Sequence, residues 1–227
     1  MKRMTKTAIV AVVALAAAAS TQAATYTGDL ILGFTAQSGN DFIVDLGQAS
    51  TLTSGQQFDL SGSLGGFNLN TVHWGIIGDK NVGGVRSVWT STGGTLPNTV
   101  PNVTTWGAID TATKSVYQNF PVGGAGDNFT IAASDDNSWN QQTIQGALTT
   151  QYHNAYEDPN VIGVGTASLF SLVANGSAPS PFGTFTLNSG GIVTFTAAAV
   201  PEPSTYGLLA GAGLLVLSLR RQFARRT

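Results

Sequence analysis

The sequence predicts a mainly β protein: a β-sandwich-like domain that carries one or two helices and is flanked by an apolar segment at each end. Short runs of alternating apolar and polar residues, typical of strands that bury one face, recur along the chain. Glycine-rich turn signals separate these runs. The chain contains no cysteine, and 42% of its 227 residues are hydrophobic. A hydrophobic core, rather than disulfide bonds, must therefore stabilise the domain.

The N-terminal residues 1–23 have the pattern of a secretory signal peptide. Basic residues without any acidic residue precede an unbroken apolar run over residues 8–19, and small residues follow. Such a segment is exported by the Sec machinery and removed by signal peptidase. The small residues place the cut after Ala23, with Ala24 as the alternative. The 12 apolar residues fall short of the roughly 17–25 that a bilayer span needs, so an uncleaved anchor is the less favoured alternative.

The first strands are expected as two antiparallel pairs. Residues 29–34 and 41–46 alternate, with a turn signal between them, and predict a hairpin. Residues 72–77 and 85–90 predict a second pair that turns at residues 78–81.

The last strands are expected over residues 168–173, 182–187 and 192–196. The final two are separated by a glycine-rich turn and are rich in Thr, Phe and Val. This combination makes a hairpin the strongest local prediction in the chain.

Two segments break the alternation and predict helices. Residues 139–156 follow a cluster of N-cap residues and place one apolar residue every four positions. The members of this stripe are Ile144, Leu148, Tyr152 and Tyr156. A second, more loosely spaced pattern predicts a helix within residues 103–120.

The charge of the central region limits its partners. Residues 24–199 hold three basic residues, Lys80, Arg86 and Lys114, against eleven acidic ones, a net charge of −8. Such a domain stays soluble, repels anionic polymers and does not bind nucleic acid.

We expect no catalytic residue and therefore no enzyme. The chain has two histidines, His73 and His153, and neither a G-x-S-x-G nor an H-E-x-x-H motif. Paired carboxylates for glycoside hydrolysis are best represented by residues 157–158 and 135–136, which charged turns explain better.

No cofactor is expected, and calcium is the one metal ion that the sequence leaves open. Clustered oxygen ligands suit calcium, although the spacing is not that of an EF-hand. These ligands are Asp127, Asn128, Asp135, Asp136 and Asn137.

The aromatic residues suggest an alternative function, that of a carbohydrate-binding, lectin-like module. Aromatic faces stack on sugars, but at strand and helix spacings they more often lie in a core. The candidates are Trp74, Trp89, Trp106, Trp139, Tyr117, Tyr152 and Tyr156.

The C-terminal end has three parts. Residues 200–205 hold Pro201, Glu202 and Pro203, a stiff extended segment. Residues 205–219 are apolar and predict a transmembrane helix of roughly 22 Å, short against a bilayer core of about 30 Å. The basic tail 220–227 stops translocation and sets an N-out, C-in orientation. Its arginines are Arg220, Arg221, Arg225 and Arg226.

This order of segments resembles the PEP-CTERM sorting signal of Gram-negative bacteria. The resemblance covers residues 200–227 and implies recognition of Pro201, Glu202 and Pro203 by an exosortase, a membrane transpeptidase that cuts there. It further implies transient anchoring in the inner membrane, then delivery to the cell surface or the exopolysaccharide matrix. Residues 28–46 and 182–196 also resemble a group of proteins that carry this signal, a likeness that implies no activity.

Overall fold

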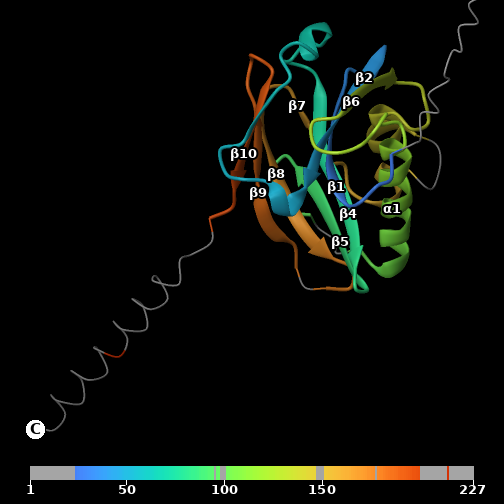
Figure 1. Cartoon of the computed structure of the whole chain (residues 1–227), viewed down its shortest axis with the longest axis vertical. Coiled ribbons are helices and arrows are strands. Elements are labelled where there is room, and N and C mark those ends of the chain that lie inside the picture. Colours follow the sequence, from blue (N-terminus) through green and yellow to red (C-terminus); the bar gives the residue numbers. More distant parts are fainter. Residues whose placement is uncertain are drawn as a thin grey trace, which may run out of the picture.

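The strands of the protein form one curled antiparallel sheet. The computed structural model describes residues 24–94, 96–97, 101–146, 151–176, 178–199 and 214. Within this part of the chain the strand order is β3-β10-β9-β8-β5-β4-β1-β2-β6, and β7 pairs with β4. The mainly β prediction is confirmed. The two layers of the sandwich are provided by the two halves of this curled sheet (Figure 1).

The elements have the following bounds. The strands are β1 (Asp29–Thr35), β2 (Asn40–Gln48), β3 (Gln57–Asp59), β4 (His73–Val82), β5 (Val85–Thr92), β6 (Asn128–Ala132), β7 (Asn160–Ile162), β8 (Gly165–Val173), β9 (Ser180–Leu187) and β10 (Ile192–Ala197). The helices are α1 (Val103–Tyr117) and the short α2 (Tyr152–Ala155), with a π-helical turn at Gln141–Gln145.

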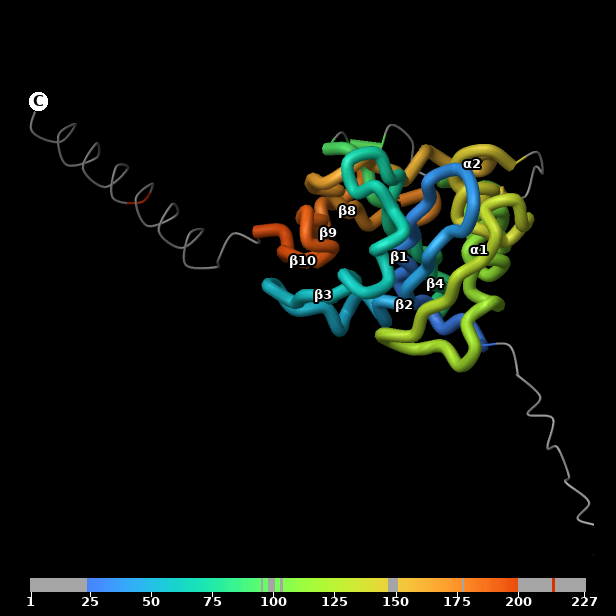
Figure 2. The backbone as a smooth tube through the Cα atoms, turned by 90° about the horizontal axis from the view of Figure 1, so that it is seen from above, coloured from blue at the N-terminus to red at the C-terminus, as the bar shows by residue number. Residues whose placement is uncertain are grey.

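Two hydrophobic cores lie on opposite faces of the central strands. In β1, Leu30, Leu32 and Phe34 face the inner core, which is enclosed by the curl of the sheet. The intervening Ile31 faces the outer core, which α1 and α2 cover. Every residue of β1 is buried. The described chain begins beside α1 and ends beside β10, on opposite sides of the molecule (Figure 2).

The predicted strand pairs form, but one turn lies elsewhere. Residues 78–81 belong to β4, so the prediction of a turn there is wrong. The turn is made by Gly83 and Gly84, whose φ angles are +59° and +86°, and Val82 pairs with Val85. A two-residue hairpin turn of type I′ has positive φ at both positions, and glycine adopts it without steric cost.

The predicted continuous helix over residues 139–156 is also wrong. Gly146 is extended, with φ −66° and ψ 148°, and ends the helical turn before it. A side chain at this position would collide with the Gln151 amide, so glycine is required where the chain folds back. Residues 147–150, including Leu148 of the predicted stripe, lie outside the described part. Tyr152 and Tyr156 do pack in the outer core.

The helix predicted within residues 103–120 is confirmed as α1. The side chain of Asn102 accepts a hydrogen bond from the backbone N–H of Thr105 and caps the first turn. Ile109, Ala112 and Val116 recur at helical spacing and pack on the sheet. This packing brings α1 against β4 and β5, which creates the site described next.

Candidate functional site

A buried carboxyl group, that of Asp79, lies between β4 and α1. Asp79 is 1% exposed, and no described group donates a hydrogen bond to either of its carboxyl oxygens. Burial raises its pKa to about 8, helped by the negative charge of the neighbouring Asp110. The ammonium of Lys114 opposes this rise. At neutral pH Asp79 therefore carries a proton.

A pocket of about 430 Å³ opens beside this carboxyl group. The Asp110 carboxylate and the Lys114 ammonium pair at 2.7 Å across one turn of α1, and their side chains are 20% and 54% exposed. On β4, the Lys80 ammonium donates to Gln48 Oε1 at 2.9 Å. The pocket is lined by Tyr26, Thr27, Gly28, Asp79, Lys80, Asn81, Trp106, Asp110 and Lys114.

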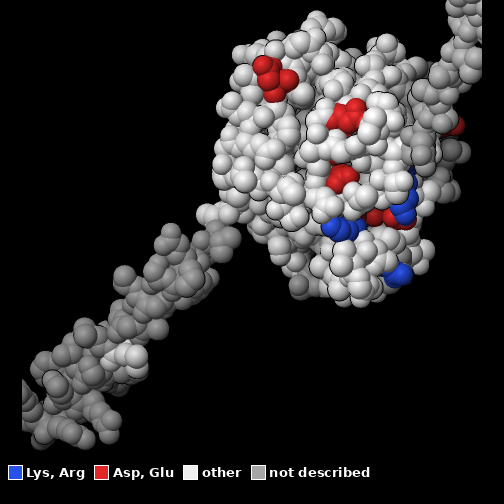
Figure 3. Space-filling model, viewed as in Figure 1, with Lys and Arg blue, Asp and Glu red and all other residues white. Residues whose placement is uncertain are grey.

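The three basic residues of the domain all lie around this pocket. Lys80 and Lys114 line it. The Arg86 guanidinium lies 5.3 Å from the centroid of the Trp106 ring, which also lines it. Figure 3 shows the basic side chains gathered at one end of the domain, with acidic side chains spread over the rest of that view. The domain is thus acidic overall, but its positive charge is concentrated at one place.

A second buried network fixes the N-terminal segment to the sheet. The Tyr117 hydroxyl lies 2.8 Å from Asp45 Oδ2 and 3.0 Å from Asp29 Oδ2. The Tyr26 hydroxyl donates to the backbone carbonyl of Asp79 and accepts from its N–H. Burial raises the pKa of Asp45, which hydrogen bonds from Tyr117 and two backbone N–H groups partly oppose. These bonds hold the segment after residue 23 against α1 and β4.

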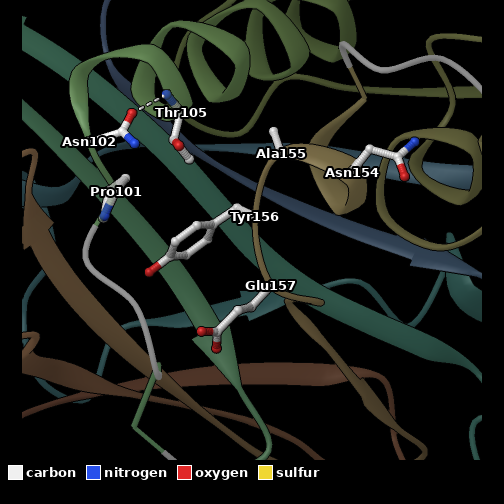
Figure 4. Close-up of a pocket in the computed structure, with 7 residues that line it drawn as sticks. All are labelled: Pro101, Asn102, Thr105, Asn154, Ala155, Tyr156 and Glu157. Atoms are coloured by element: carbon white, nitrogen blue, oxygen red, sulfur yellow. Dashed lines mark hydrogen bonds between the residues drawn. The ribbon is translucent and has the colours of Figure 1, made fainter.

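Residues 157 and 158, one of the predicted carboxylate pairs, have different surroundings. Glu157 lines a separate pocket of about 430 Å³ beside the start of α1, together with Tyr156 and Asn102 (Figure 4). The Asp158 carboxylate instead accepts hydrogen bonds from the backbone and side chain of Asn160.

The residues predicted to hold calcium are divided between the two ends of β6. Asp127 accepts hydrogen bonds from the backbone of its own loop, and Asp135 accepts one from Asn137. Asp127 and Asn128 lie at the start of β6, and the other three residues follow its end; the five residues of the strand span about 16 Å at 3.3 Å per residue. Within the described residues no group of three or more His, Asp or Glu side chains is placed to hold a metal ion. Calcium binding stays a prediction.

The two histidines have amide partners. His73 Nε2 lies 3.0 Å from the Gln37 side-chain amide, and His153 Nδ1 lies 3.2 Å from the carbonyl of Gln142. These contacts orient the two imidazole rings within the fold.

Most of the candidate sugar-stacking aromatics lie in the cores. All of them except Trp89 are at most 9% exposed. Trp106, at 9%, is the one whose ring borders the pocket beside Asp79. The described surface therefore offers a polar pocket with an aromatic wall rather than an open aromatic platform.

Comparison with protein families identifies the C-terminal end. The model of the PEP-CTERM protein-sorting motif matches residues 199–222. The chain carries a PEP-CTERM sorting motif. It is therefore an exported protein with an exosortase as its processing partner. Comparison with curated proteins and with solved structures found no match.

The PEP-CTERM motif begins two residues after the last strand. β10 ends at Ala197, and the match starts at residue 199. Pro201, Glu202 and Pro203, Arg220 and Arg221 fall within the match; Arg225 and Arg226 follow it. All of them lie outside the described residues, as do Ala23 of the predicted cleavage site and, except for residue 214, the predicted membrane helix. In the described part no helix is both long and apolar enough to cross a membrane.

The group formed by Asp79, Asp110 and Lys114 was not predicted from the sequence. Asp79 falls in the segment that was predicted as a turn, where an acidic residue is ordinary. The one local signal is the spacing of Asp110 and Lys114, an i,i+4 pair on a helix. Nothing in the sequence pairs either of them with Asp79, because β4 and α1 meet only in the folded chain.

Proposed function

We propose that the protein is a non-catalytic component of the cell surface or the exopolysaccharide matrix, delivered there by exosortase processing. The observation that carries the proposal is the PEP-CTERM motif directly after a folded, net acidic domain. The motif supports export and processing, and the domain is what remains to act outside the cell.

The membrane step is part of the proposal. The signal peptide would start export, and the apolar segment 205–219 with its arginines would halt it, N-out and C-in, until the exosortase cuts. A helix of roughly 22 Å is short for a bilayer core of about 30 Å, which suits a temporary anchor. On this export route, residues 1–23 are the signal peptide, residues 24–199 the exported domain and residues 200–227 the sorting signal.

The contacts of the polar residues support a non-catalytic role. The histidines contact amide groups, and Asp158 and Asp135 accept hydrogen bonds from their own loops. A hydrolase needs a nucleophile or carboxylate pair aligned with a base or acid. Incubating the purified protein with polysaccharides is expected to release no new reducing ends; their release would overturn this part of the proposal.

The sorting part is tested with Pro201→Ala/Pro203→Ala in a host that contains an exosortase. Loss of both prolines removes the stiff segment, and we expect the variant to keep its C-terminal residues and to stay in the membrane fraction. Mass spectrometry of the surface and membrane fractions measures this. The chain has a matched control, because Pro179 and Pro181 form a second Pro-x-Pro at the start of β9.

The control variant Pro179→Ala/Pro181→Ala is expected to be processed and released like the unchanged protein. Pro181 is exposed, so the substitution leaves the cores intact. Unchanged processing of the Pro201→Ala/Pro203→Ala variant, with the same mass and the same surface delivery, would show that the motif does not direct sorting.

A further inference from the structure

The pocket between β4 and α1 concentrates the positive charge of an acidic domain. Residues 24–199 contain three basic side chains. Lys80 and Lys114 line this pocket, and Arg86 lies against the ring of Trp106, which also lines it. The salt bridge to Asp110 is the one ion pair among the described residues, and it engages Lys114 alone. Lys80 contacts an uncharged amide, and Arg86 stacks on an indole. Two of the three cations are therefore not neutralised by a carboxylate.

The acidic groups of the pocket leave this positive charge in excess. Asp110 carries one negative charge, whereas Asp79 is protonated at neutral pH because burial raises its pKa to about 8. Two cations, Lys80 and Lys114, thus line the pocket beside one anion, and Arg86 adds a third cation against the Trp106 ring. Elsewhere the domain is acidic, which repels anions from the rest of the surface and leaves this pocket as their favoured place of contact.

The other pocket walls suit a ligand rich in hydroxyl groups. The Asn81 side chain is exposed and offers an amide, and the Asp110 carboxylate can accept hydrogen bonds from hydroxyls. Trp106 adds an apolar indole edge. The volume of about 430 Å³ lies in the range of small-molecule pockets, about 300–1,000 Å³.

We propose that this pocket binds the carboxylate-bearing ring of an acidic sugar. The Lys114 and Lys80 ammonium groups would hold the carboxylate, and Asp110 and Asn81 would bind the ring hydroxyls. A dianion such as phosphate is disfavoured, since Asp110 stands among the cations. This inference rests on the proposed matrix function in one respect: that function supplies the source of the ligand, an acidic polysaccharide outside the cell.

The test is isothermal titration calorimetry of the full-length chain in detergent with D-glucuronate. Saturable binding is expected, with D-glucose and acetate at least tenfold weaker because each lacks one half of the recognised chemistry. Lys114→Gln is expected to weaken glucuronate binding at least tenfold. Its exposed ion pair contributes only about 0–1 kcal/mol to stability, so the variant remains folded.

Thr186→Glu is the matched control. It lowers the net charge by the same one unit, but on β9, which β8 and β5 separate from β4. Unchanged binding in this variant is expected and shows that the effect of Lys114 is local. Equal weakening in both variants, equal binding of glucose or acetate, tighter binding of inorganic phosphate, or no saturable binding of glucuronate would overturn the proposal.

A final arm identifies the source of the ligand. An oligouronate is expected to bind through one ring with about the affinity of the monosaccharide, because the acidic surface around the pocket repels the rest of the polymer. An oligouronate that does not bind would overturn the polymeric source. Surface delivery is measured separately with the Pro201→Ala/Pro203→Ala variant. A pocket that does not bind glucuronate in a protein that is sorted normally refutes this inference and leaves the proposed sorting function standing.

Discussion

The free energy of unfolding is expected to fall as the pH rises from about 4 to about 8, because Asp79 must lose its proton inside the protein. Its pKa is about 8 in the folded chain and near 3.8 when unfolded. Between these values the folded state binds more protons, so its stability is present at low pH and is lost as the pH approaches 8. The slope attributable to Asp79 is about 1.4 kcal/mol per pH unit at most. Burial raises the pKa of Asp41 and Asp45 too, which acts in the same direction.

The measurement is urea unfolding at a series of pH values, with Asp79→Asn as the test variant. Asparagine resembles the protonated acid in shape and keeps a hydrogen-bond donor, but it does not ionise. We expect the variant to lose most of the pH slope and to be more stable than the unchanged protein at pH 8. Asp136→Asn, a substitution of an exposed carboxylate, is the control and should keep the slope.

An unchanged slope in Asp79→Asn would show that Asp79 does not hold its proton at neutral pH. Asp110→Asn gives a second check. It removes the repulsion that helps to raise the pKa of Asp79, so the loss of stability should shift to lower pH without disappearing, since burial is the larger cause.

Trp139→Ala is expected to destabilise the protein by about 3–5 kcal/mol, as truncation of a large buried aromatic does. The Trp139 side chain is fully buried, and its indole N–H donates to Asn160 Oδ1 at 2.8 Å. The ring lies over Gly33 of β1, where an added Cβ would collide with the ring atoms. Removal of the ring leaves a cavity and an unpaired amide. Thermal unfolding measures the loss, at about 2–4 °C per kcal/mol for a chain of this size.

Gly33→Ala tests the same contact from the other side. The extra methyl overpacks the site, and we expect a loss of about 1–3 kcal/mol or more. In the double variant with Trp139→Ala the methyl has room, so the combined loss should be smaller than the sum of the two. Gly107→Ala in α1 meets no atom within 4 Å and should leave stability unchanged or raise it. If the losses of stability in Gly33→Ala and Trp139→Ala are strictly additive in the double variant, the contact between residue 33 and the Trp139 ring is contradicted.

The regular strands were predictable because their patterns are local. Leu30, Leu32 and Phe34 alternate, and they do share one face. The edge strand β3 and the short β7 were not predicted, since three residues are too few for a pattern and depend on partners far along the chain. The helix expected over residues 139–156 failed for a similar reason. Gly146 is required there by the Gln151 side chain, a contact that periodicity does not reveal.

The candidate site was predictable only in its parts. The count of three basic residues against eleven acidic ones is a property of the sequence. The packing of α1 on β4 and β5 brings Lys80 and Lys114 to one pocket and places Arg86 against its Trp106 wall. The same holds for the aromatic residues. Their number is a property of the sequence, but the fold determines that most of them are buried.

By itself the sequence determined the sorting address and the position of most strands along the chain, because a motif such as Pro201-Glu202-Pro203 and an alternating run each depend on neighbouring residues. The tertiary structure alone decided the chemistry of the carboxyl groups. Asp79 and Asp110 are 31 positions apart, and Tyr117 reaches Asp29 across 88. A carboxyl group changes its protonation when it loses water and gains a charged neighbour, and both changes require the folded chain.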